Sequence, residues 1–166
     1  MNDDALAQRL HRLEAAEAIR NLKARYLAAC DRKDPATMRA CFADGTVEID
    51  YGAVGGFDNA DALVALYTQM ACHDHMVELH HGSNPQISVT AEDAAEATWS
   101  LQYGLINTRD KSLTQLAGYY EDGYRCIDGQ WKIVRTRFVA TSTLALELDA
   151  SQLKVLFAGR TPPAME

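Results

Sequence analysis

The side chains best suited to chemistry gather in one short stretch, since four of the five histidines lie between residues 73 and 81. His73 and His75 carry the ring nitrogens that zinc binds, but no third ligand follows at an interval typical of a zinc site. We therefore expect no metal here and interpret this part as the solvated end of a helix. His80 and His81 stand just before a predicted sheet. In an extended chain they point in opposite directions, so one of them could enter a cavity, and strand geometry alone leaves open which of the two it is.

A second group that could do chemistry is Asp31, at the predicted end of a helix. Alone, an aspartate there is usually a cap or a turn former, and a lone histidine is usually a satisfied hydrogen-bonding residue. Tyr26 lies five residues before Asp31, on the helix face that carries Ile19 and Leu22. Around an apolar cavity, an Asp, a His and two Tyr supply a base, the group that orients it and two phenolic donors.

The elements that must position these groups are helices first and long strands last, which is typical of the α+β class. Apolar spacing predicts a helix from Asp3 or Asp4 to Cys30, and Asp34-Pro35 opens a short helix to about residue 42. Asp58 can cap a third helix that runs to about residue 72. We expect strands over residues 46–51, after Pro85, and over residues 94–108, 113–127 and 131–143, followed by a short helix over residues 151–157.

Length and composition limit the classes of protein to consider. The 166 residues are enough for one domain with its own core, and 48% are hydrophobic. A net charge of −7 without a basic stripe argues against nucleic-acid binding. No apolar run is long enough to span a membrane, no export signal is recognisable, and the four cysteines are scattered, so we expect a cytoplasmic protein with reduced thiols.

Three segments together resemble a known family: Tyr26-Leu-Ala-Ala-Cys-Asp31, Ile49-Asp50-Tyr51 and His80-His-Gly-Ser-Asn-Pro85. With Gly118-Tyr-Tyr-Glu-Asp122 and Ile127-Asp-Gly-Gln-Trp-Lys-Ile133, they resemble the SnoaL-like, nuclear transport factor 2-like superfamily, over residues 12 to 140. The resemblance implies a cystatin-like, cone-shaped α+β barrel, with N-terminal helices packed in a curved, mainly antiparallel sheet. We expect a single domain over residues 1–166 that ends in a C-terminal tail.

Within the superfamily, the chain is most similar to the scytalone dehydratase and bile acid 7α-dehydratase branch. The resemblance implies that His80 is the general base, that Asp31 orients it, and that Tyr26 and Tyr51 bind the substrate oxygen. A dehydratase of this kind would remove a proton next to a carbonyl and release water, without a metal or an organic cofactor. Cys30 stands where scytalone dehydratase has a second Tyr, and Ala140 stands where the bile acid enzyme has a substrate-contacting Arg, so the substrate of neither enzyme carries over.

Apolar side chains predicted on the long strands complete the expected site. Four of them are expected to contact substrate, and they favour a small, apolar cyclic or polycyclic ligand: Trp99, Tyr103, Tyr120 and Phe138. The resemblance leaves open whether water or a halide is the leaving group, and two further alternatives stay open. One is a ketosteroid-isomerase-like isomerase, and the other is a non-catalytic ligand-binding module similar to the small subunits of ring-hydroxylating oxygenases. The resemblance also implies a homotrimer, with a dimer as the second possibility.

Overall fold

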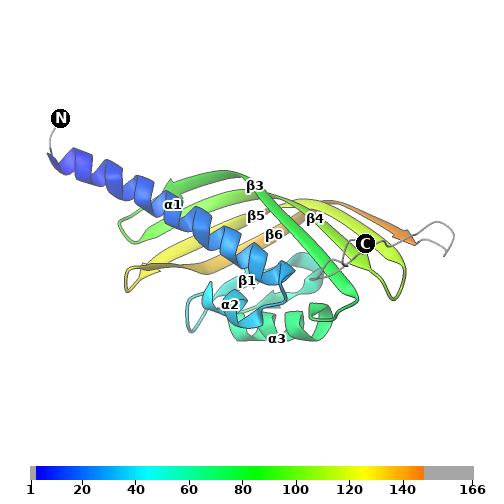
Figure 1. The fold of residues 1–166 in the computed structure, drawn as a ribbon. Coiled ribbons are helices and arrows are strands. Elements are labelled where there is room, and N and C mark those ends of the chain that lie inside the picture. The colour runs from blue at the N-terminus through cyan, green and yellow to red at the C-terminus, as the bar shows by residue number, and fades with distance from the viewer. Residues whose placement is uncertain (1–2, 148–166) are drawn as a thin grey trace, which may run out of the picture.

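A computed structural model describes residues 3–147 of the chain, in which helices lie against one face of a long, curved sheet (Figure 1). The helices are α1 (Asp3–Asp31), α2 (Pro35–Ala40), the short 3-10 helix η1 (Gly52–Val54) and α3 (Ala60–Ala71). The strands are β1 (Glu48–Asp50), β2 (Gly56–Phe57), β3 (Met76–Val89), β4 (Ala94–Asn107), β5 (Ser112–Ile127) and β6 (Gln130–Glu147).

The sheet has six strands in the order β2-β1-β6-β5-β4-β3, and β1 and β6 form its one parallel pair. The other pairs are antiparallel. Strands β3 to β6 follow one another through tight turns, and β1 and β2 are joined through η1. The predicted α+β architecture, with N-terminal helices packed in a curved, mainly antiparallel sheet, is confirmed. Within the described residues the sheet is open, with β2 and β3 as its two edges.

The helix starts follow local capping chemistry. Asp34 caps α2 by accepting a hydrogen bond from the backbone N–H of Thr37 (3.0 Å), and Pro35 occupies the first helical position. The expectation that Asp58 caps α3 is wrong by one residue. The side chain of Asn59 is the cap, because it accepts from the backbone N–H of Ala62 (2.8 Å).

Strand β3 is the largest departure from the sequence prediction. It begins at Met76, so His80 lies within the sheet rather than just before it. Its polar residues do not resemble a strand, but β3 is an edge strand with several exposed side chains. A bulge at Ser83–Gln86 accommodates Pro85 and the positive φ of Asn84. The short helix predicted over residues 151–157 lies outside the described residues.

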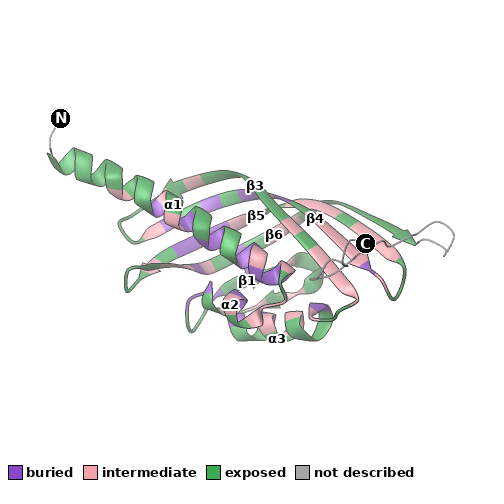
Figure 2. Cartoon of the chain, viewed as in Figure 1, coloured by how far each residue is buried: buried purple, intermediate pink, exposed green. Residues whose placement is uncertain are grey.

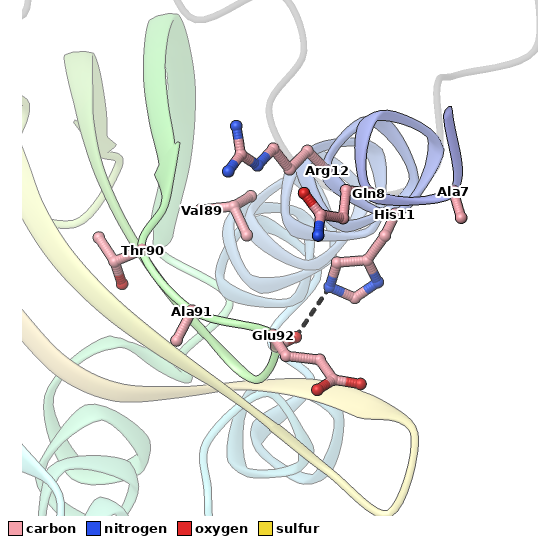
Figure 3. Close-up of a pocket in the computed structure, with 8 residues that line it drawn as sticks. All are labelled: Ala7, Gln8, His11, Arg12, Val89, Thr90, Ala91 and Glu92. Carbon is pink, nitrogen blue, oxygen red and sulfur yellow. Dashed lines mark hydrogen bonds between the residues drawn. The ribbon is translucent and has the colours of Figure 1, made fainter. Parts of the chain in front are cut away.

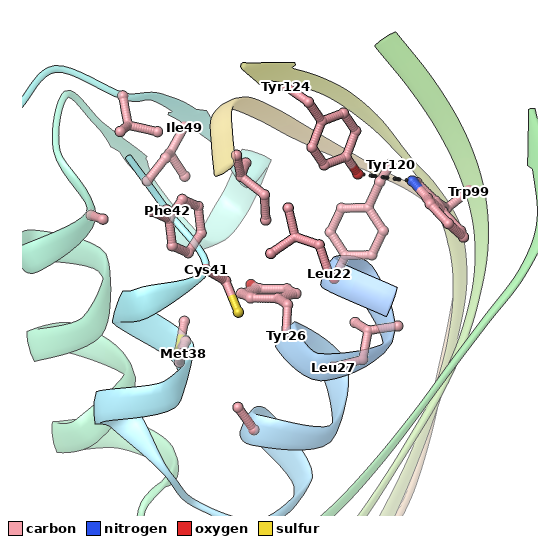
Figure 4. Packing of buried hydrophobic residues seen from close by; sticks show 14 of the residues in the cluster. Leu22, Tyr26, Leu27, Met38, Cys41, Phe42, Ile49, Trp99, Tyr120 and Tyr124 are labelled. Carbon is pink, nitrogen blue, oxygen red and sulfur yellow. Dashed lines mark hydrogen bonds between the residues drawn. The ribbon is translucent and has the colours of Figure 1, made fainter. Parts of the chain in front are cut away.

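Buried residues lie between α1 and the sheet (Figure 2), where apolar side chains form the core (Figure 4). The core also contains an ion pair. The Nζ of Lys23 lies 2.8 Å from Oδ2 of Asp122, and both side chains are almost completely buried. Asp122 also accepts hydrogen bonds from the hydroxyls of Tyr124 and Thr136, both at 2.7 Å. Burial lowers the pKa of Lys23, and Asp122 opposes that change. The pair therefore ties α1 to β5 beneath the site described next.

No helix within residues 3–147 is both long and apolar enough to cross a membrane. The N-terminal half of α1 extends beyond the core, where Leu6, Leu10 and Leu13 are exposed in the single chain. The homotrimer stays a prediction, since it concerns contacts between chains.

Candidate active site

A cavity of about 330 Å³ lies between the C-terminal half of α1, α3 and the sheet. Apolar side chains form most of its wall, including Met38, Leu63, Leu101, Leu116 and Phe138. The polar groups that face it come from α1, α3, the end of β1, and β3 to β5. The cavity therefore has the composition typical of small-molecule sites, with a few placed polar groups in an apolar wall.

A second hollow of about 550 Å³ lies between the start of α1 and the turn after β3 (Figure 3). Its residues are mostly exposed, and His11 Nε2 there contacts the backbone oxygen of Glu92 at 2.8 Å. Although this hollow has the larger volume, its histidine ring contacts a backbone oxygen and not a carboxylate, so it lacks the arrangement of a base with the group that orients it.

Asp31 and His80 meet at the first cavity. The Oδ1 of Asp31 lies 2.7 Å from Nδ1 of His80, and the backbone N–H of His80 donates to both carboxylate oxygens, at 3.0 and 3.2 Å. Asp31 is the last residue of α1 and His80 lies in the middle of β3. The carboxylate thus holds both the backbone and the ring of the histidine, which fixes the direction of the imidazole.

The hydrogen bond also determines the tautomer of His80. An ionised carboxylate can only accept, so the ring proton of a neutral imidazole belongs on Nδ1 and the lone pair on Nε2. Nε2 makes no hydrogen bond with the residues that the structure describes. The lone pair is thus available to a ligand in the cavity.

His80 faces the cavity, and the exposed His81 does not line it. The alternation of β3 explains this, because neighbouring side chains of a strand point to opposite faces. Tyr103 lies opposite His80 on β4, with its ring centroid 4.7 Å from that of the imidazole.

A pair of phenols lies deeper in the cavity. The hydroxyls of Tyr26, on α1, and Tyr51, after β1, are 2.8 Å apart. Burial raises the pKa of both phenols, so they stay protonated at neutral pH and can donate hydrogen bonds. One proton joins the two hydroxyls, which leaves the second for another acceptor.

Tyr120 extends this aromatic wall. Its ring, labelled in Figure 4, lies 6.0 Å from that of Tyr51 and 4.9 Å from that of Phe138. Nζ of the buried Lys23 lies 3.4 Å from the centroid of the same ring. Tyr103, Tyr120 and Phe138, three of the four expected substrate contacts, line the cavity.

Trp99 is not among the lining residues, contrary to expectation. Its side chain is buried in the core, where Nε1 donates to the hydroxyl of Tyr124 at 3.1 Å (Figure 4). Trp99 pairs directly with Tyr120 across β4 and β5, and of the two only Tyr120 lines the cavity.

Sequence reasoning missed two polar lining residues, Glu78 and Tyr67. Glu78 lies two residues before His80 on β3, so it has the same orientation. A prediction that started the strand at residue 76 would have found it.

The remaining reactive groups to consider are the cysteine thiol at the cavity and side chains that could bind a metal ion. Burial raises the pKa of the Cys30 thiol to about 12, so this cavity cysteine is protonated and a poor nucleophile. Within residues 3–147, no three or more His, Cys, Asp or Glu side chains are grouped so that they could hold a metal ion. The rings of His73 and His75 stack on each other at the end of α3, 5.2 Å apart.

Helices packed in an open curved sheet around an apolar cavity are the fold of the nuclear transport factor 2-like class. The chain belongs to the SnoaL-like domain family, whose sequence model matches residues 11–137.

Solved structures share the fold at low identity. A candidate scytalone dehydratase from Novosphingobium aromaticivorans is 23% identical, with a TM-score of 0.74 over 93% of this chain and 98% of its own. The type 3 hexachlorocyclohexane dehydrochlorinase LinA from Novosphingobium barchaimii is 18% identical, with a TM-score of 0.74 over 93% and 99%. A candidate aromatic ring hydroxylase from N. aromaticivorans is 17% identical, with a TM-score of 0.72 over 81% and 94%.

Proposed function

We propose that this protein is a cofactor-independent lyase that abstracts a proton next to a carbonyl of an apolar cyclic substrate and expels water. The observation that carries the proposal is the 2.7 Å contact between Asp31 and Nδ1 of His80 at the wall of a largely apolar cavity. This contact leaves Nε2 of His80 available as a base for an apolar ligand, which is the kind of ligand that such a wall favours.

The proposed reaction uses one proton twice. Nε2 of His80 takes the proton from the carbon next to the carbonyl, and Asp31 stabilises the imidazolium that forms. The electrons move to the carbonyl oxygen, which accepts a hydrogen bond from the Tyr26–Tyr51 pair. When the enolate collapses, the C–O bond at the neighbouring carbon breaks. The imidazolium returns its proton to the departing hydroxide, which leaves as water.

The expected rate contributions of these groups are large enough for enzymatic catalysis. General acid–base catalysis contributes about 10²–10⁴-fold, and a donor at the developing oxyanion about 10²–10³-fold. The likeness to a candidate scytalone dehydratase supports water as the leaving group. The likeness to a dehydrochlorinase supports a second candidate, in which chloride leaves in place of hydroxide.

The test is a screen of cyclic β-hydroxy ketones and β-chloro ketones for loss of water or hydrogen chloride by mass spectrometry. We expect His80→Ala and Asp31→Asn to keep the fold, measured by circular dichroism, and to lose about 100-fold or more in turnover. His81→Ala is the matched control, because His81 is the exposed neighbour on the same strand.

Full turnover in either His80→Ala or Asp31→Asn overturns the proposal. A product of unchanged mass, with hydrogen moved to another carbon, would instead identify an isomerase.

A further inference from the structure

A second polar group lies in the cavity wall, and the proposed reaction does not use it. The Oε1 of Glu78 accepts a hydrogen bond from the hydroxyl of Tyr103 at 2.8 Å. Its Oε2 contacts the ammonium of Lys33, and the hydroxyl of Tyr67 lies 3.5 Å away. Tyr67 donates mainly to the backbone oxygen of Cys30. These contacts hold a carboxylate, with its charge balanced by Lys33, at an apolar wall.

Glu78 keeps the capacity to accept a further hydrogen bond. A carboxylate has about four acceptor positions, and the structure fills two of them at close range, from Tyr103 and Lys33. Its side chain is only 8% exposed, yet Glu78 lines the cavity. Because Glu78 lines the cavity, an acceptor position that Tyr103 and Lys33 leave open is available to a ligand there, and an apolar ligand without a donor would leave that position unsatisfied.

The position of Glu78 relative to the base is fixed by the strand. Glu78 and His80 are two residues apart on β3 and both line the cavity, so they lie about 7 Å apart along it. Tyr103 lies against both, since its ring is tilted against that of His80 and its hydroxyl donates to Glu78. Burial, and after it the charge of Glu78, raise the pKa of Tyr103, so this phenol is a donor.

The cavity wall thus contains phenolic donors, at Tyr26 on α1 and Tyr51 after β1, and an acceptor, at Glu78 on β3. We propose that Glu78 is a specificity-determining subsite that accepts a hydrogen bond from a hydroxyl on the substrate ring. The substrate class is then a hydroxylated cyclic ketone, with its hydroxyl about one ring away from the carbon that loses its proton. The assignment of the carbonyl rests on the proposed function, whereas the assignment of the hydroxyl rests on Glu78 alone.

A purely structural role of Glu78 makes a different prediction. As an ion pair with Lys33, it would join the turn after α1 to β3 and stabilise the fold, and its loss would affect all ligands equally. Selectivity between ligands that differ only in a hydroxyl separates the two roles.

The experiment measures the dissociation constants of three probes by titration calorimetry: 1-tetralone, 6-hydroxy-1-tetralone and 6-methoxy-1-tetralone. We expect the protein to bind the hydroxyl probe about tenfold more tightly than the methoxy probe, since a hydrogen bond to a charged group has about this effect. Glu78→Met should remove this preference and should not weaken the binding of 1-tetralone, because this ligand then no longer covers a carboxylate without donating to it. Glu78→Gln, which keeps the side-chain shape, should reduce the preference, and it serves if the methionine variant does not fold.

Glu96→Gln is the matched control, because Glu96 lies on the exposed face of β4 and pairs with Arg135. The proposal is overturned if the native protein shows no preference for the hydroxyl probe, or if both Glu78 variants keep it.

His80→Ala separates this result from the proposed function, because it should abolish turnover and keep the hydroxyl preference. Turnover that survives in His80→Ala would reject the lyase mechanism without affecting the Glu78 subsite.

Discussion

Asp31 breaks a local rule of helix chemistry. A negative side chain at the C-terminus of a helix is unfavourable, because the unpaired carbonyls already carry negative partial charge there. The last turn of α1 also contains no basic residue. Two N–H groups of His80, one from the backbone and one from the ring, compensate this charge. Local violations with such a specific compensation are expected at functional sites.

Lys23 is a second residue whose position has a cost. Moving an ammonium and a carboxylate out of water costs free energy. The Lys23–Asp122 pair offsets this cost through its good geometry and through two further donors to Asp122. The ammonium also lies over the ring of Tyr120, in the cavity wall. The pair therefore holds the wall as well as the core.

Lys23→Met should lower the free energy of unfolding by about 3–5 kcal/mol, because it leaves Asp122 buried without its counter-charge. Arg20→Met is the control on the same helix, since Arg20 is half exposed and its contact with Glu17 is 3.5 Å long. Its effect should stay within about 0.5 kcal/mol. Urea denaturation compares them, and equal effects would contradict the account of the buried pair.

At the scale of elements, the site depends on how closely β5 and β6 approach each other beside Phe138. A Cβ added at Gly118 would lie 2.4 Å from the backbone oxygen of Val139 and 2.6 Å from Cζ of Phe138. The register of β5 and β6 shifts at this point, between Ala117 and Gly118. Glycine is therefore required for the packing that places Phe138 in the cavity wall.

Gly118→Ala should destabilise the protein by about 1–3 kcal/mol, as overpacking does, and weaken ligand binding through the displaced Phe138. Gly104→Ala, on β4, is the control, because a Cβ there meets nothing within 4 Å. Chemical denaturation of both variants checks this. A Gly118→Ala protein as stable as Gly104→Ala would mean that the strands can separate without cost.

For the whole molecule, the sequence predicts what local chemistry controls. The helix starts near Asp34 and Asn59 and the long hairpins follow from capping residues, apolar spacing and the Asp128-Gly129 turn. The start of β3 does not follow from such local signals, because an exposed edge strand has no apolar alternation. The prediction that Trp99 lines the cavity also fails. The alternation of a strand indicates which face of the sheet a side chain points to, but not where along the strand the cavity lies.

The candidate site could be predicted only through the combination of distant residues. Asp31 and His80 are separated by 49 positions, and no local pattern specifies that the end of α1 packs on the middle of β3. Family resemblance suggested the pair. The backbone hydrogen bond from His80 to Asp31, and the acceptor at Glu78, depend on the folded arrangement and required coordinates.

The central claim is that His80, oriented by Asp31, removes a proton from carbon. The most direct test is exchange of the C1 hydrogens of 2-tetralone for deuterium in D₂O, followed by proton NMR, since exchange requires neither a leaving group nor the natural substrate. The account predicts that the native protein and His81→Ala accelerate exchange, whereas His80→Ala and Asp31→Asn leave it at, or close to, the rate in buffer. Exchange in His80→Ala as fast as in the native protein, or no acceleration by the native protein, would contradict it.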